Sequence, residues 1–127
     1  MSLRTQLQGT GVAIVTPFRS TMEVDFDALG KLIDFIIKNG IEYIVSLGTT
    51  GETPTLDTEE KYDILHYTFE KVNGRVPVVV GVGGNNTKTV MENLQSYPFS
   101  QHYHTSRSHR GKSGCKKITD RAFFFQI

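Results

Sequence analysis

The sequence predicts an α/β fold, on three observations. Short apolar runs alternate with longer segments in which apolar residues recur every three or four positions. The order strand, helix repeats three times before residue 99, and glycine, proline or asparagine marks most of the junctions. Parallel strands joined by helical crossovers explain this order. Because a (β/α)₈ barrel needs about 250 residues, the pattern in a chain of 127 residues by itself favours an open sheet.

Three apolar runs are the predicted strands: residues 12 to 16, 42 to 47 and 78 to 82. Runs without polar alternation are typical of parallel strands that are buried on both faces. A polar loop marked by glycine or proline follows each run. These loops are Thr16-Pro17-Phe18, Gly48-Thr49-Thr50-Gly51-Glu52 and Gly83-Gly84-Asn85-Asn86-Thr87. Ligands of α/β folds bind at the carboxyl ends of strands, so the candidate site lies in these loops.

Three helices are predicted between and after the strands. The first begins near Asp25 and ends at Asn39-Gly40. The second begins at Asp57, with Glu60 in capping-box spacing, and ends at Asn73-Gly74. Its expected buried stripe is Tyr62, Leu65, Phe69 and Val72. The third is expected to be capped by Thr87, to turn Val90, Met91 and Leu94 inward, and to end at Pro98.

Charge divides the chain near residue 100. Residues 1 to 100 carry eight Lys or Arg against twelve Asp or Glu, whereas residues 101 to 127 carry six against one. We therefore predict a domain over residues 1–99 and a basic, divergent tail over residues 100–127. The lone Cys115 indicates a reducing, cytoplasmic compartment, and no apolar run is long enough to span a membrane. Cys115 and the scattered histidines lack zinc-site spacing, so no metal is expected.

Thr49 and Thr50 are the candidate functional residues. A threonine hydroxyl donates and accepts at once, as a proton relay requires, and backbone amides beside Gly48 and Gly51 can hold a carboxylate. The alternative is that these residues only shape a tight turn. For Glu52 a structural role as a hydrogen-bond acceptor is favoured over an acid role, and His66 is interpreted as a partly buried helix residue.

Residues 9 to about 99 resemble the dihydrodipicolinate synthase family of pyruvate-dependent class I aldolases. The resemblance is carried by motifs that occur in order at compatible spacing. They are Gly11-Val12-Ala13-Ile14-Val15-Thr16-Pro17-Phe18, Gly48-Thr49-Thr50-Gly51-Glu52, Thr55-Leu56, Arg75-Val76-Pro77-Val78, and Gly81-Val82-Gly83 with Asn85 and Thr87.

The resemblance implies the N-terminal portion of a TIM (β/α)₈ barrel, about three βα units, in place of the open sheet. It implies condensation of pyruvate with aspartate semialdehyde through a lysine Schiff base in lysine and diaminopimelate biosynthesis, without a cofactor. Thr49 would link two tyrosines in a proton relay, and Thr50 would help hold the pyruvate carboxylate. The family is commonly homotetrameric. Asn85 matches a position near the lysine feedback site of some members, whereas Thr58 and Lys61 stand where feedback-sensitive members carry histidines.

The match stops after Tyr97-Pro98-Phe99, and no fourth strand is expected beyond it. The family's relay tyrosine, carboxylate-binding arginine and Schiff-base lysine lie later, so the lysine role is assigned to none of Lys112, Lys116 and Lys117. We hypothesise that residues 100–127 are a frameshifted, truncated or disordered tail, so that the chain alone is inactive and leaves a sheet edge uncovered.

Two alternatives stay open. One is an N-acetylneuraminate lyase-like or keto-sugar aldolase, since the Gly-Thr-Thr-Gly-Glu loop is shared beyond one substrate. The other is nucleic-acid binding through Arg107, Arg110, Lys112, Lys116, Lys117 and Arg121. The preferred interpretation includes neither a nucleic acid nor a membrane as partner.

Overall fold

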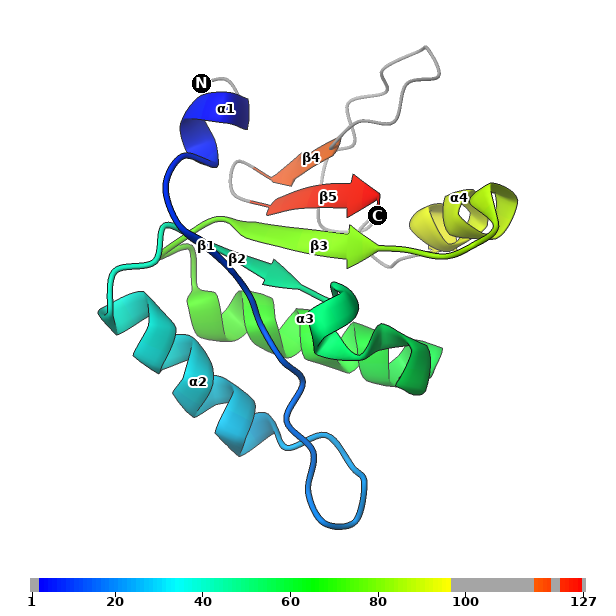
Figure 1. The fold of residues 1–127 in the computed structure, drawn as a ribbon, viewed down its shortest axis with the longest axis horizontal. Coiled ribbons are helices and arrows are strands. Elements are labelled where there is room, and N and C mark those ends of the chain that lie inside the picture. The colour runs from blue at the N-terminus through cyan, green and yellow to red at the C-terminus, as the bar shows by residue number, and fades with distance from the viewer. Residues whose placement is uncertain (1–2, 97–115, 120–121, 127) are drawn as a thin grey trace.

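The structure, a computed structural model, describes residues 3–96, 116–119 and 122–126. Its strands form a single sheet, and two long helices, α2 and α3, pack on one face of that sheet (Figure 1). The helices are α1 (Leu3–Gln6), α2 (Phe26–Lys38), α3 (Thr58–Val72) and α4 (Thr87–Ser96), with two 3-10 turns, η1 (Thr49–Gly51) and η2 (Thr53–Thr55). The strands are β1 (Gly11–Ala13), β2 (Tyr43–Ser46), β3 (Val78–Val82), β4 (Lys116–Thr119) and β5 (Ala122–Gln126).

The strand order is β1-β2-β3-β5-β4, and every neighbouring pair is parallel except β4 with β5. Register aligns Val12, Ile44 and Val78 across the first three strands. The core lies between these strands and α2 and α3, and its most enclosed apolar side chains are Leu29, Ile33, Ile44, Leu65, Val72, Val78 and Val80. The three predicted strands and the three predicted helices are thus confirmed.

β1 is shorter than the predicted run of residues 12 to 16. Ile14 still donates its N–H to the carbonyl of Val45 (2.9 Å), but no ladder continues past it. Two features of the sequence end the strand early. The Thr16 hydroxyl donates to the carbonyl of Gly51, and Pro17 has no N–H to donate to a neighbouring strand.

The helix ends largely follow the sequence. Asp25 caps α2 by accepting from the N–H of Ala28. Asp57 and Glu60 form the reciprocal capping box at α3. At α4 the prediction was wrong: the side chain of Asn86, not of Thr87, accepts from first-turn amides. Thr87 is already the first helical residue, and asparagine is the stronger cap.

Two predicted helix faces are rotated. In α3 the buried residues are Ile64, Leu65, Thr68 and Val72, whereas Tyr62 and Phe69 are half-buried. Thr68 is polar, so a pattern of apolar residues placed the centre of the stripe too far toward Phe69. In α4, Val90 is buried and Leu94 half-buried, but Met91 is 43% exposed because it lies about 100° around the helix from Val90. His66 is exposed beside Glu70 rather than partly buried.

The expectation that no strand follows residue 100 was also wrong. β4 and β5 form an antiparallel hairpin with a register shift between Lys117 and Thr119, and β5 pairs with β3. The sequence did not predict this hairpin, because a short apolar run forms a strand only where a partner strand is available, and the partner of β5 is the distant β3. In the described residues, no helix is long and apolar enough to cross a membrane.

Candidate functional site

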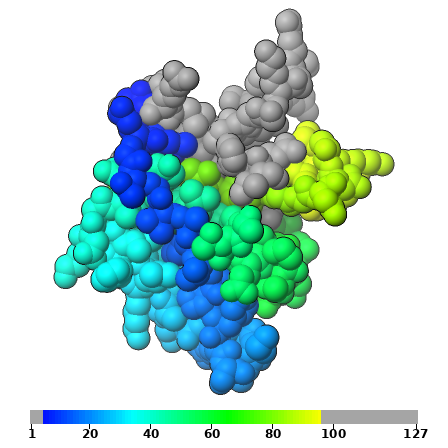
Figure 2. All heavy atoms as spheres, viewed as in Figure 1, coloured from blue at the N-terminus to red at the C-terminus, as the bar shows by residue number. Residues whose placement is uncertain are grey.

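The loops that follow β1 and β2 lie against each other. Parallel register brings the carboxyl ends of these strands to one edge of the sheet. In the space-filling view, the segment after β1 runs between the α2 side of the molecule and the green loop after β2 (Figure 2). The sequence-predicted convergence of these two loops is therefore observed.

Gly81 allows the loop after β2 to lie close to β3. A Cβ at Gly81 would come within 2.5 Å of the Leu47 carbonyl oxygen and 2.9 Å of the Gly48 Cα. Both obstacles are backbone atoms, so no rotamer change could relieve the overlap. Gly81 is a position where the absence of a side chain sets the path of the candidate loop.

Thr16 ties the end of β1 to the same loop. Its hydroxyl donates to the Gly51 carbonyl at 2.7 Å, and the Thr16 side chain is buried. Gly51 is buried as well. This buried hydrogen bond joins segments that are 35 residues apart, and it fixes the position of the loop relative to the end of β1.

The candidate loop is bounded by left-handed backbone at two residues that are not glycine. Leu47 and Glu52 both have φ of 55°. Such conformations cost of order 1–3 kcal/mol each and gather at functional sites. The chain continues through η2, where the Thr55 hydroxyl donates to the Glu52 carbonyl at 2.8 Å.

Thr49 and Thr50 occupy the first two positions of η1, and both are exposed. Their hydroxyls are thus open to a ligand while the glycines on either side, Gly48 and Gly51, are buried. This arrangement can offer hydroxyl and amide donors to an anion without moving the strand that carries them.

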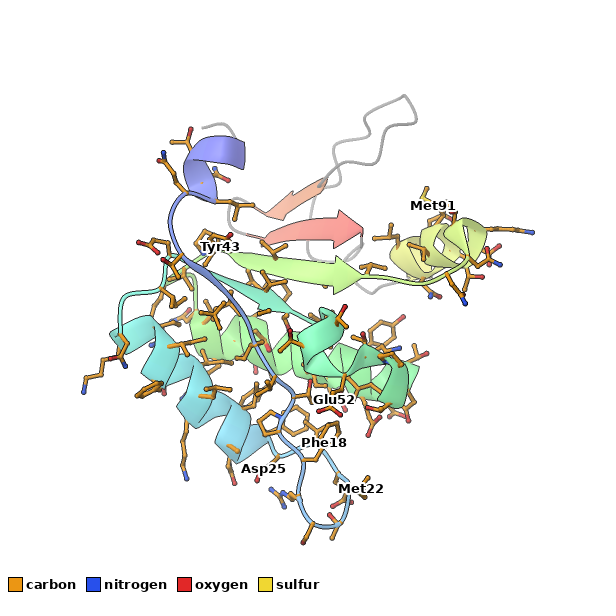
Figure 3. All side chains as sticks on the ribbon, in the orientation of Figure 1. Phe18, Met22, Asp25, Tyr43, Glu52 and Met91 are labelled. Atoms are coloured by element: carbon orange, nitrogen blue, oxygen red, sulfur yellow. The ribbon has the colours of Figure 1, made fainter. Side chains whose placement is uncertain are left out.

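Glu52 does not act as the structural acceptor that was expected. It follows η1 on the loop after β2 (Figure 3), and among the described residues no donor reaches its carboxylate; only its backbone carbonyl accepts side-chain and backbone hydrogen bonds. Thr16 and Gly81, which shape the site most, were not singled out for that role from the sequence. The sequence did offer a signal for them: each is a small or hydroxyl-bearing residue near the end of a predicted strand, Thr16 after β1 and Gly81 in β3.

A hollow of about 60 Å³ lies between α3, α4 and the end of β3. Its lining residues are Thr53, Thr58, Lys61, Tyr62, Gly81, Val82, Gly83 and Asn93. Thr58 and Lys61, which stand where the resemblance places histidines of feedback-sensitive members, both line this hollow. Asn85 is exposed and does not line it.

The predicted residues of the tail fall into two groups. Arg107, Arg110, Lys112, Cys115 and Arg121 lie outside the described residues, whereas Lys116 and Lys117 lie in β4. Among the described side chains, no group of three His, Cys, Asp or Glu residues is placed to hold a metal ion.

Comparison with known proteins identifies the family. The model of the dihydrodipicolinate synthetase family matches residues 6–98. A 4-hydroxy-tetrahydrodipicolinate synthase of Parabacteroides distasonis is 52% identical over 93 residues, covering 73% of this chain and 31% of the relative. The corresponding Bacillus subtilis enzyme is 55% identical over 76 residues, covering 60% and 26%. The chain therefore spans about a third of these curated relatives or less.

Solved structures agree. A dihydrodipicolinate synthase from Thermotoga maritima matches with a TM-score of 0.68 at 37% identity, over 71% of this chain and 30% of that one. The enzyme from Acinetobacter baumannii, solved with pyruvate, matches at 0.67 and 38% identity, over 70% and 31%. The strands β1 to β3 and the helices α2 to α4, which lie within the matched residues 6–98, are thus the first part of a TIM barrel, which corrects the open sheet that the pattern alone favours. The chain belongs to the dihydrodipicolinate synthetase family.

Proposed function

We propose that this chain carries the pyruvate-binding loop of a 4-hydroxy-tetrahydrodipicolinate synthase, with Thr50 holding the pyruvate carboxylate and Thr49 passing a proton. The exposed hydroxyls of both residues, on a loop held by Thr16 and Gly81, support this assignment. The Acinetobacter baumannii relative, whose structure contains pyruvate, supports the choice of substrate.

The proposed reaction joins pyruvate to aspartate semialdehyde through a Schiff base, with the enzyme in the cytoplasm. A Schiff base requires an amine that is kept neutral by desolvation or by a nearby cation. The lysines of residues 6–98 all lie on helices: Lys31 and Lys38 on α2, Lys61 and Lys71 on α3, and Lys88 on α4. The described βα units thus bind and position substrate, and the covalent step belongs to the remaining part of a barrel.

Borohydride trapping tests the covalent part of this proposal. Incubation of the chain with pyruvate and borohydride, followed by mass measurement, should show no stoichiometric adduct. A full adduct on Lys112, Lys116 or Lys117 would show that this chain supplies the amine itself.

A chimera tests the roles of the two threonines. Residues 9–98 of this chain would replace the matching segment of the Parabacteroides distasonis synthase, which supplies the rest of the barrel. We expect the chimera to be active, and Thr49→Val to lower kcat about 100-fold or more, the usual contribution of a positioned proton-transfer group. Thr50→Val should mainly raise KM for pyruvate. Thr89→Val, at an exposed α4 position, is the matched control. A folded, active chimera that is indifferent to both changes would refute the assignment.

A further inference from the structure

The hairpin β4–β5 closes a sheet edge that the family match leaves open. The matched segment ends at residue 98, after β3 and α4. β5 then pairs with β3 in parallel over five residues, from Val78 with Ala122 to Val82 with Gln126. The sequence of β5, Ala-Phe-Phe-Phe-Gln, is the kind of apolar run that buried parallel strands use.

The segment β3, α4, β5 repeats the order of the preceding units. β1 and β2 are parallel with α2 between them, and β2 and β3 are parallel with α3 between them. In a (β/α)₈ barrel the next parallel strand pairs with the third in this way. β5 therefore takes the sheet position that belongs to a fourth barrel strand.

β4 ends the parallel order. It runs antiparallel to β5 at the outer edge, where a barrel would continue with another parallel strand. Lys116 and Lys117 stand on this outermost strand, and lysines on edge strands discourage pairing with further chains. The hairpin thus both extends and terminates the sheet.

We propose that β4 and β5, over residues 116–119 and 122–126, form an edge cap: β5 takes the place of the fourth barrel strand against β3, and β4 covers the outer edge of β5. The cap prevents the β3 edge from recruiting other chains. This inference concerns assembly and does not depend on the proposed activity.

Hydrogen exchange of single amides, followed by NMR, can detect the cap. The N–H of Ile44 donates to the carbonyl of Pro77, so the backbone of Pro77 faces β2. Backbone N–H and C=O groups alternate in direction along a strand. Those of Val79 and Gly81 therefore also point to β2, whereas those of Val80 point to β5. In the unchanged chain, the Val80 amide and the β5 amides should exchange at least about 100-fold more slowly than in an unstructured peptide.

Phe125→Pro is the disruptive variant, because the register directs the Phe125 amide toward β3 and proline removes that donor. Phe125→Val keeps the amide and is the matched control. With Phe125→Pro we expect the Val80 amide to lose its protection while Val79 and the α2 amides keep theirs, and light scattering should show self-association. Phe125→Val should remain protected and monomeric.

Two outcomes would overturn the proposal. One is exchange of residues 122–126 at unstructured rates in the unchanged chain while β3 amides stay protected. The other is a Phe125→Pro variant with unchanged Val80 protection and no self-association. Retained α2 protection distinguishes loss of the cap from global unfolding.

Discussion

The helix-packed core and the loop after β2 are held in place by different forces. The core buries large aliphatic side chains of β2, β3, α2 and α3, many of them within 1% of complete enclosure. The candidate loop buries almost no apolar side chain and depends on one glycine, one threonine hydroxyl and two strained backbone positions. Stability is therefore distributed over many contacts, whereas the geometry of the site depends on a few. Mutations in the core should therefore act mainly on stability, whereas mutations at the few contacts of the loop should act mainly on its geometry.

The largest expected effect is on the core side of this comparison. Leu65→Ala should lower the free energy of unfolding by about 3 kcal/mol, because Leu65 is 1% exposed and its loss leaves a cavity. Urea unfolding measures the change. Phe35→Ala, at a side chain that is 64% exposed, is the control and should cost far less. Equal losses would contradict the assignment of the core.

Gly81→Ala should act mainly on the loop. The new Cβ would overlap backbone atoms of Leu47 and Gly48, and overpacking of this kind costs about 1–3 kcal/mol. Amide chemical shifts of Gly48 to Glu52 should move more than those of α2. Gly51→Ala is the matched control for the energetic cost: its Cβ would meet Thr16 at an ordinary 3.4 Å, so it should lower the free energy of unfolding less than Gly81→Ala. If the amide chemical shifts of Gly48 to Glu52 are unchanged in Gly81→Ala, the prediction is wrong.

Thr16→Val should have a smaller effect. It removes the donor to the Gly51 carbonyl and leaves that acceptor unpaired, which costs about 1–2 kcal/mol. Thr16→Ser keeps the hydroxyl and should restore the loop shifts, which a purely steric role of Thr16 would not explain. Heat denaturation measures the stability of Thr16→Val and Thr16→Ser, and the amide chemical shifts of Gly48 to Glu52 report the loop geometry of the two variants.

The smallest effect concerns the surface where α2 meets α3. Lys71 and Arg75 hydrogen-bond the Asp34 carboxylate, both at 2.8 Å, and lower its pKa below the ordinary value of 3.8. The folded-state pKa is depressed, so any stabilisation is present above the unfolded-state value and is lost as the pH falls through the folded-state value. Because Asp34 is solvent-exposed, this loss should be slight and sensitive to salt. NMR titration gives the Asp34 pKa, and a value at or above 3.8 would contradict the ion pairs.

Much of the fold could be predicted from local sequence. The capping box at Asp57 and Glu60 and the cap at Asp25 are short-range hydrogen bonds between residues three apart, so they can be recognised without the fold. The same is true of the turn after β2, whose glycines and threonines follow an apolar run. Thr49 and Thr50 are exposed on that turn.

Other features depended on residues distant in the chain. Gly81 matters because the Leu47 carbonyl lies where a Cβ would stand, and Thr16 matters because Gly51 lies 35 residues away. Ile64 and Thr68 are buried because α3 packs against both the sheet and α2, which no pattern in α3 itself reveals.

The amino-acid order alone determined the βα repeat, the helix boundaries and the family motifs, because propensity, capping and periodicity act over a few residues. Only the tertiary structure decided which strands pair at the β3 edge, which helix face is buried and which small residues shape the candidate loop. These features arise from contacts between segments that are far apart in sequence, and the free energy of such contacts exists only once the segments are brought together.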